Sequence, residues 1–147
     1  IRLLTMKYIL ILTMLLASTA FAGTDFDGTM ALAKQGNSTA QTVLGIMYDK
    51  GEGVTENDVE AVKWYRKAAV RGDADLQHNV GVMYYADDGA EENNISAYVW
   101  MSMAKTQGNT NTAKSLEILK PHMTKQQIAV GQALAAKCYE SNYKDCD

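Results

Sequence analysis

The sequence predicts an all-α solenoid in which pairs of helices stack on one another. A template recurs after 36 residues, and a period of this length is typical of stacked arrays whose units bury their apolar faces against their neighbours. Apolar residues within each copy also recur at the spacing of one helix face. Of eight compared pairs, seven are identical and one exchanges Leu for Val. The positions are Leu44, Gly45, Tyr48, Gly53, Ala61, Trp64, Ala68 and Gly72 in the first copy and Val80, Gly81, Tyr84, Gly89, Ala97, Trp100, Ala104 and Gly108 in the second.

Residues 1–22 predict a signal peptide, with Met6 as the start of translation. Lys7 is followed by an apolar run over residues 8–16 and by the A-x-A sequence of residues 20–22, which is the order of a cleaved secretion signal. A membrane anchor is the alternative, but the stretch is shorter than the ~20 apolar residues that span a bilayer. We therefore expect a periplasmic or secreted protein that keeps no stable membrane anchor after cleavage.

The remaining residues, 23–147, predict one domain with an acidic balance. They hold 12 basic and 17 acidic residues, a net charge of −5. Nucleic acid and anionic membranes bind clustered Lys and Arg, so this balance argues against both as partners. The length suits a single domain, with full units over about 37–72 and 73–108 and partial caps over 23–36 and 109–147.

The first unit predicts two helices joined by a turn. Gly51 ends the first helix and Asn57 begins the second, where Glu60 three residues later predicts a capping box. Gly72 then ends the second helix in a left-handed conformation. The apolar faces comprise Ala40, Leu44, Met47 and Tyr48 in the first helix and Ala61, Trp64, Tyr65, Ala68 and Ala69 in the second.

The second unit repeats this plan, with Asn93 as the predicted cap of its second helix and Trp100 as its large apolar residue. Gly45 and Gly81 lie in the middle of the first helices, where Gly costs about 1 kcal/mol relative to Ala. We expect these glycines to let the paired helix approach closely, so that the Trp side chain fills the adjacent space.

The chain on either side of the two units predicts terminal helices that cover the ends of the array. Residues 26–35 indicate the second helix of an incomplete leading unit. Residues 112–119 indicate the first helix of a trailing unit, and Pro121 breaks the chain after it. Thr124 and Gln127 then predict a capping box at the start of a long last helix.

The two cysteines, Cys138 and Cys146, predict a disulfide, because an even pair in an exported chain most simply forms one. Closing this small loop stabilises by about 2–3 kcal/mol in the chain-entropy model and would clamp the end of the array. A metal site is the alternative, but the segment holds no His and the spacing is not C-x-x-C.

The first unit resembles the Sel1-like repeat, a relative of the tetratricopeptide repeat. The pattern A-Q-x-x-L-G-x-M-Y-x-x-G-x-G-V, followed by A-x-x-W-Y-x-x-A-A-x-x-G, lies between Ala40 and Ala74. The second unit departs from the pattern at its turn, where Asp87 and Ala90 stand at the positions of a Gly and a Val. The resemblance implies a right-handed α/α solenoid and a scaffold or adaptor role, often in secreted or periplasmic bacterial proteins.

The residues give no sign of a catalytic, cofactor or metal site, and we expect a protein that is not an enzyme. His78 and His122 belong to no H-E-x-x-H or Cys-His arrangement, and the sequence has no G-x-S-x-G or glycine-rich phosphate loop. The acidic residues within 87–92 lack the ligand order of a calcium loop. Some cysteine-rich relatives have been linked to β-lactam binding, but this sequence lacks their cysteine pairs, so a β-lactam hydrolase-like enzyme is the least favoured alternative.

A partner would most simply bind the concave face, which the first helix of each unit lines. The candidate partner-binding residues are Asp49, His78, Val82 and Tyr85, because the repeat itself does not explain them. Tyr85 is an extra aromatic beside the repeated Tyr84, and exposed aromatics are enriched at binding hot spots. Packing of Tyr85 against the neighbouring helix is the alternative interpretation.

The sequence therefore predicts an exported protein–protein interaction module, acting as a scaffold, adaptor or regulator in the cell envelope. Its expected partner is a protein or peptide, and no cofactor is expected. A small-molecule or cell-wall-fragment binding protein is the alternative, and it would need a deep pocket rather than a shallow groove.

Overall fold

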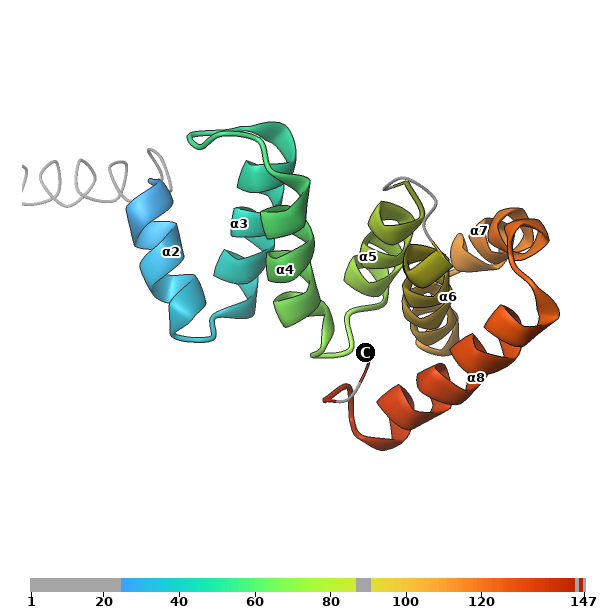
Figure 1. Cartoon of the computed structure of the whole chain (residues 1–147). Helices are drawn as coiled ribbons and strands as arrows, with labels where there is room; N and C mark the ends of the chain where they lie inside the picture. The colour runs from blue at the N-terminus through green and yellow to red at the C-terminus, as the bar shows by residue number, and fades with distance from the viewer. Residues whose placement is uncertain (1–24, 87–90, 145, 147) are drawn as a thin grey trace, which may run out of the picture.

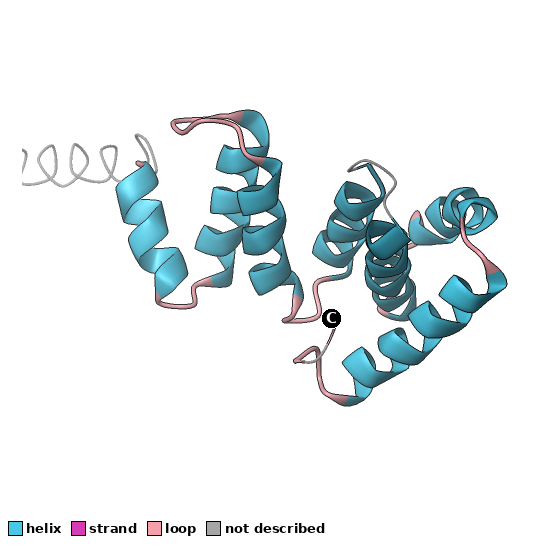
Figure 2. Cartoon of the chain, viewed as in Figure 1, coloured by secondary structure: helices cyan, strands magenta, loops and turns pink. Residues whose placement is uncertain are grey.

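The computed structural model describes residues 25–86, 91–144 and 146, and these form helices joined by loops, with no strand among them (Figure 1). Figure 2 shows the same arrangement by secondary structure, and the predicted all-α solenoid is confirmed. The predicted signal peptide lies outside the described residues. The elements are α2 (Phe26–Lys34), α3 (Ser38–Lys50), α4 (Asp58–Ala69), α5 (Ala74–Ala86), α6 (Glu91–Thr106), α7 (Thr112–Leu119), the 3-10 helix η1 (Lys120–His122) and α8 (Lys125–Glu140).

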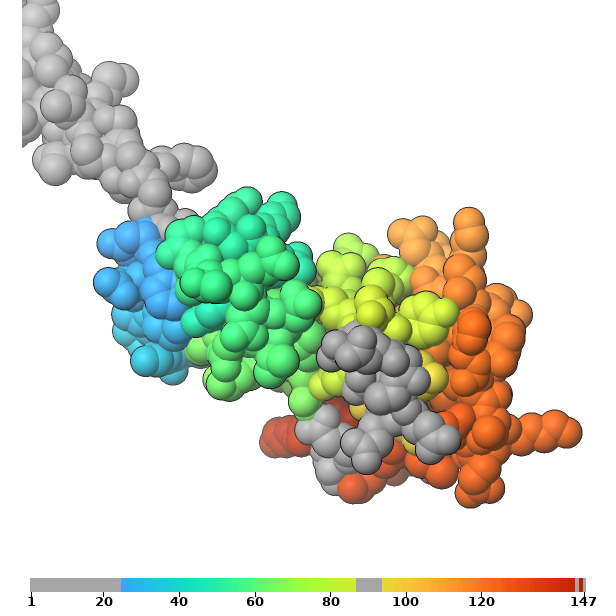
Figure 3. Space-filling model, turned by 45° about the horizontal axis from the view of Figure 1, so that its top comes forward, coloured from blue at the N-terminus to red at the C-terminus, as the bar shows by residue number. Residues whose placement is uncertain are grey.

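The helices follow one another as stacked pairs. Helices α3 and α4 form one hairpin and α5 and α6 the next, with α2 before them and α7 and α8 after them (Figure 1). Figure 3 shows the same succession on the surface, from blue at α2 to red at the C-terminal segment. The predicted helices over 26–35 and 112–119 are therefore present as α2 and α7.

Each first helix of a pair begins with the same capping device. A side-chain oxygen at each start accepts a hydrogen bond from the backbone N–H three residues later, which satisfies a donor that the helix leaves open. The residues that accept these bonds are Asn37, Asp73 and Asn109, with distances of 2.9, 2.9 and 3.0 Å. Asn109 does so from two residues before Asn111, which is the N-cap position of α7. The residue before each cap is a glycine in the left-handed region, as predicted for Gly72: Gly36, Gly72 and Gly108 have φ of 89°, 89° and 95°.

Of the two predicted caps of second helices, Asn57 is confirmed and Asn93 is wrong. Asn57 Oδ1 accepts from the backbone N–H of Glu60 at 3.1 Å. The predicted capping box is not formed, because the Asn57 N–H donates to the carbonyl oxygen of Tyr48 at 2.8 Å and the Glu60 carboxylate pairs with Lys63 at 3.1 Å. In the second unit, α6 begins at Glu91, so Asn93 lies inside the helix rather than at its cap. The second turn departs from the repeat pattern, and the helix starts earlier there.

The mid-helix glycines do permit close helix approach, but the neighbour is not the predicted Trp. A Cβ atom on Gly45 would lie 2.5 Å from the ring of Tyr65, and one on Gly81 would lie 2.7 Å from Cγ of Met101. Tyr65 and Met101 are 36 residues apart, so the same position of the template fills the space in both units. Trp64 instead packs into the core between α2, α3 and α4.

A buried glutamine joins each unit to the preceding one. Gln41 Nε2 donates to the carbonyl oxygen of Ala33 at 3.1 Å, and Gln77 Nε2 donates to that of Ala69 at 3.2 Å. Both bonds run from a first helix to the last residues of the helix before it. Because a buried donor is costly without a partner, these bonds satisfy Nε2 of each glutamine and fix the spacing between units.

The C-terminal segment folds back against the array and is closed by the predicted disulfide. Cys138 and Cys146 are joined with an S–S distance of 1.98 Å, and Cys138 is fully buried. Between them, Tyr143 packs into the core and its ring lies beside Gly72, at the loop between α4 and α5. The disulfide thus holds a segment that contacts the middle of the array.

Candidate functional site

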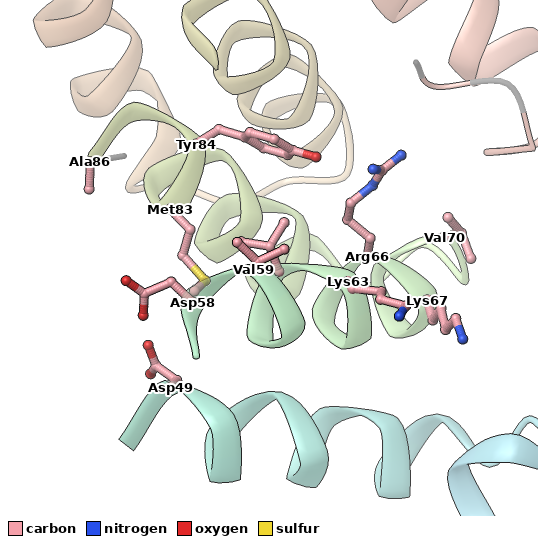
Figure 4. Close-up of a pocket in the computed structure, with 11 residues that line it drawn as sticks. Asp49, Asp58, Val59, Lys63, Arg66, Lys67, Val70, Met83, Tyr84 and Ala86 are labelled. Atoms are coloured by element: carbon pink, nitrogen blue, oxygen red, sulfur yellow. The ribbon is translucent and has the colours of Figure 1, made fainter. Parts of the chain in front are cut away.

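A groove of about 680 Å³ lies between α4 and α5 and is the candidate functional site (Figure 4). Helix α4 provides most of its wall, α5 provides the opposite wall, and the end of α3 contributes one residue. The lining residues are Asp49 from α3, Asp58, Val59, Val62, Lys63, Arg66, Lys67 and the following Val70 from the α4 side, and Met83, Tyr84 and Ala86 from α5.

The wall on α4 is an apolar row that a folded protein ordinarily buries. Val59 and Val62 are one turn apart, and Val70 follows just beyond the end of the helix, so all three can line one side of the groove. Val59 is 72% exposed, which makes it the most exposed of the large apolar side chains in the described residues. Met83 and Tyr84 contribute the opposing wall from α5.

Charge is distributed unevenly along the groove. Figure 4 shows Asp49 and Asp58 at one end and Arg66 and Lys67 towards the other. The order along α4 follows the helix dipole, with an acid in the first turn and cations in the last turn. The groove therefore has an acidic end and a basic end.

The basic side chains are held by neighbouring groups. Lys67 Nζ lies 4.2 Å from the ring centroid of Trp64, and the Arg66 guanidinium lies 5.9 Å from that of Trp100. These cation–π contacts orient the two side chains at this end of the groove. The basic end of the groove is thus built on the two Trp residues of the repeat.

The acidic end also has an electrostatic effect on the core behind it. Burial, with a further contribution from the Asp49 carboxylate, raises the pKa of Tyr65 to about 12. The Tyr65 hydroxyl therefore remains protonated over the whole physiological range.

The four sequence-predicted site residues do not form one cluster. Asp49 lines the groove, whereas His78, Val82 and Tyr85 follow one another on another face of α5. His78 Nδ1 lies 3.0 Å from Thr112 Oγ1 of α7, which places this side chain in a contact between helices. Val82 is 38% exposed.

Tyr85 is half-buried rather than projecting into solvent. It packs against the apolar cluster shared by α6 and α7, and its ring centroid lies 6.0 Å from that of His122. The packing described as the alternative interpretation of this residue is therefore present. The acidic residues considered for calcium, within 87–92, have no described side chains.

The sequence interpretation missed the residues of α4 that line the groove. Val59 and Val62 were not assigned to any face, and Lys63 and Lys67 were not considered. The signal was present in the comparison of the two copies, because Lys63 and Lys67 correspond to Val99 and Met103. A position that is charged in one copy and apolar in the other indicates a helix face that is exposed in the first copy and buried in the second.

A smaller hollow of about 480 Å³ lies one unit further along, between α6, α7 and α8. Tyr98 and Ser102 line it from α6, at the positions of Val62 and Arg66 in the first copy, and Gln132 of α8 lines it from the other side. The equivalent groove of the second unit is therefore partly filled by α8.

Within the described ranges, no three His, Cys, Asp or Glu side chains come together as a metal-binding group. None of the helices in the same ranges has the length and apolar character to cross a membrane.

Comparisons with known proteins agree with the fold. The family model for the Sel1 repeat matches residues 38–73 and 74–109. A protective antigen of uropathogenic Escherichia coli that displays an SLR fold has 26% sequence identity and a TM-score of 0.69, over 80% of this chain and 26% of the antigen. A Sel1 repeat protein from Oxalobacter formigenes has 27% identity and a TM-score of 0.59, over 82% of this chain and 57% of its own.

This chain therefore spans about a quarter of the first of these structures and less than two thirds of the second. No curated protein matches it. Proteins with Sel1 repeats generally mediate protein–protein interactions and are generally not catalytic. With two matched repeats and two solenoid structures of the same kind, this chain belongs to the Sel1 repeat family.

Proposed function

We propose that this protein is an exported interaction module of the cell envelope and that it binds a segment of another protein in the groove between α4 and α5. The observation that carries the proposal is the exposure of Val59, an apolar side chain that lies in a groove with other apolar side chains. Exposed apolar residues grouped in this way mark interaction sites more often than isolated ones do.

The form of the groove favours a protein segment over a small molecule. A bound small molecule usually has 70–90% of its surface buried, which requires enclosing walls. Here several lining residues are themselves exposed, including Asp49, Val59 and Lys67. The volume of about 680 Å³ is nevertheless within the range of ligand sites, so a small molecule or cell-wall fragment is the second candidate.

Two features support export. Residues 1–22 have the composition of a signal peptide, and a disulfide between Cys138 and Cys146 persists most readily in an oxidising compartment. We expect the protein isolated from a periplasmic fraction to begin at Gly23 and to contain no free thiol. An uncleaved chain that remains in the cytoplasm with reduced cysteines would contradict this part of the proposal.

Crosslinked affinity capture from envelope extract tests the binding function. Wild-type mature protein is expected to recover a protein partner, and Val59→Glu is expected to lose it because a carboxylate would stand in the apolar wall. Leu32→Glu is the matched control, since Leu32 is also an exposed apolar residue but lies on α2, away from the groove. Recovery of no protein by the wild type would favour the small-molecule candidate.

A further inference from the structure

The two copies of the repeat differ on one face of their second helix. On α6, the side chains of Tyr98, Val99 and Met103 are buried, and α8 packs along this helix. Their counterparts on α4 are Val62, Lys63 and Lys67, which lie in or beside the open groove. The template therefore provides a helix face that is covered within the chain in one copy and left open in the other.

The covered copy shows what kind of element this face accepts. Helix α8 approaches α6 so closely that a Cβ atom on Gly131 would lie 2.7 Å from the ring of Tyr98. The contact is made by one apolar side of an otherwise exposed helix, with Gly131, Ala135 and Cys138 as its buried residues. An amphipathic helix is thus an occupant that this face of the repeat already binds within the same molecule.

The open copy has the spacing and the charge to bind such a helix. Val59, Val62 and Val70 provide an apolar row, and grooves of this kind accept helices whose anchors recur at i, i+3 or i+4 and i+7. The acidic end lies at the start of α4 and the basic end towards its last turn. A helix that lies antiparallel to α4 brings its own C-terminus to the acidic end and its N-terminus to the basic end.

That orientation agrees with what an isolated helix favours. Acidic residues stabilise the first turn of a helix and basic residues the last turn. In the antiparallel arrangement, the acidic first turn of the partner meets Arg66 and Lys67, and its basic last turn meets Asp49 and Asp58. Reversing the direction would place like charges together at both ends.

Resting on the proposed function, we propose that the groove binds an amphipathic helix of a partner protein, acidic in its first turn and basic in its last, antiparallel to α4. The groove then corresponds to the site that α8 occupies on the second copy. The inference names the chemistry of the partner, whereas the proposed function requires only that some protein segment binds.

Two synthetic helical peptides of one composition test this inference. Both carry Leu at i, i+4, i+7 and i+11; the first has Glu in its first turn and Lys in its last, and the second has these charges exchanged. Binding to the mature protein is measured by fluorescence anisotropy and by backbone amide chemical shifts. We expect the first peptide to bind about tenfold more tightly, because each exposed pair changes from attraction to repulsion, and the difference to shrink in high salt.

Variants of the protein locate the peptide. Val59→Glu is expected to weaken the first peptide at least tenfold, Lys67→Glu to remove most of the preference between the peptides, and the control Leu32→Glu to change neither. Equal binding of the two peptides, no binding of either, or shifts confined to α3 and the His78 face of α5 would overturn the inference. In any of these cases, affinity capture separates the two proposals. If the wild type captures a protein and Val59→Glu does not, the proposed function stands and only the helical form of the partner is wrong.

Discussion

The first and second repeats have the same packing inside and opposite surroundings outside. Gln41 and Gln77 donate to equivalent carbonyl oxygens, and Gly45 and Gly81 receive equivalent side chains. By contrast, Lys63 is exposed on α4, whereas its counterpart Val99 is only 1% exposed on α6. The repeated residues therefore maintain the solenoid, while the residues that differ between the copies depend on what each unit contacts.

The largest expected effect comes from exchanging these two counterparts. Val99→Lys places an ammonium group in the core beneath α8 and should destabilise by more than about 4 kcal/mol, because a buried unpaired charge is among the costliest single changes. Lys63→Val should change the free energy of unfolding by less than about 1 kcal/mol, since it loses only an exposed ion pair with Glu60. Urea denaturation monitored by circular dichroism measures both. Similar losses of free energy of unfolding for the two changes would mean that this face of α4 and this face of α6 are equally covered.

The second expected effect concerns the covalent closure that only the C-terminal side possesses. The double variant Cys138→Ala/Cys146→Ala should lower the free energy of unfolding by about 2–3 kcal/mol, because the unfolded chain regains the freedom of the open loop. Tyr143 lies between these residues and packs into the central core, so hydrogen exchange should rise in α8 and around Gly72 before it rises in α3. Reductant should destabilise the wild type and leave the variant unaffected. A wild type whose stability reductant does not change would show that the disulfide does not hold the segment.

The sequence predicted the repeated elements well because they depend on local residues. Gly72, for example, is predicted to end a helix in the left-handed conformation, and it has a φ of 89°. The cap at Asn93 was wrong because the second turn lacks the pattern that set the first. The Trp assignment beside Gly45 was wrong because Trp64 and Tyr65 are consecutive on α4 and so lie on different faces of the helix, and it is Tyr65 whose ring faces Gly45.

The candidate site could be predicted only in small part. Asp49 is among the predicted partner-binding residues and lines the groove, and its role in binding stays a prediction. The wall on α4 was missed because its exposure depends on where α8 packs, which is decided by contacts between distant parts of the chain. Tyr85 was chosen for its residue type, but His122 and the cluster between α6 and α7 give it packing partners that no local pattern reveals.

The third expected effect depends on pH, because the first copy has Tyr65 where the second has the non-titrating Met101. The pKa of Tyr65 is raised to about 12 in the folded state, so folding favours the protonated hydroxyl. Stability should therefore be intact below pH 10 and fall by about 2 kcal/mol as the pH rises from 10 to 12. Tyr65→Phe removes this fall, and the difference between the two stability profiles isolates it from the titration of Lys residues. Parallel profiles would mean that Tyr65 is accessible to water.

The smallest expected effects test whether the shared positions really are equivalent. Asn37→Ala and Asp73→Ala each remove the cap of a first helix and should cost about 1 kcal/mol, as measured by thermal unfolding. Asp73→Asn retains the cap oxygen and removes only the charge, so its cost should be about 0.5 kcal/mol and should diminish in salt. We expect the loss of stability to be equal at Asn37 and Asp73 but very unequal at Lys63 and Val99. That result would show that the caps depend on the repeat template, whereas Lys63 and Val99 depend on what each unit contacts. A much larger loss of stability at one cap than at the other would instead mean that the open face of the first repeat also alters its interior. The comparison between the two copies would then no longer isolate the groove.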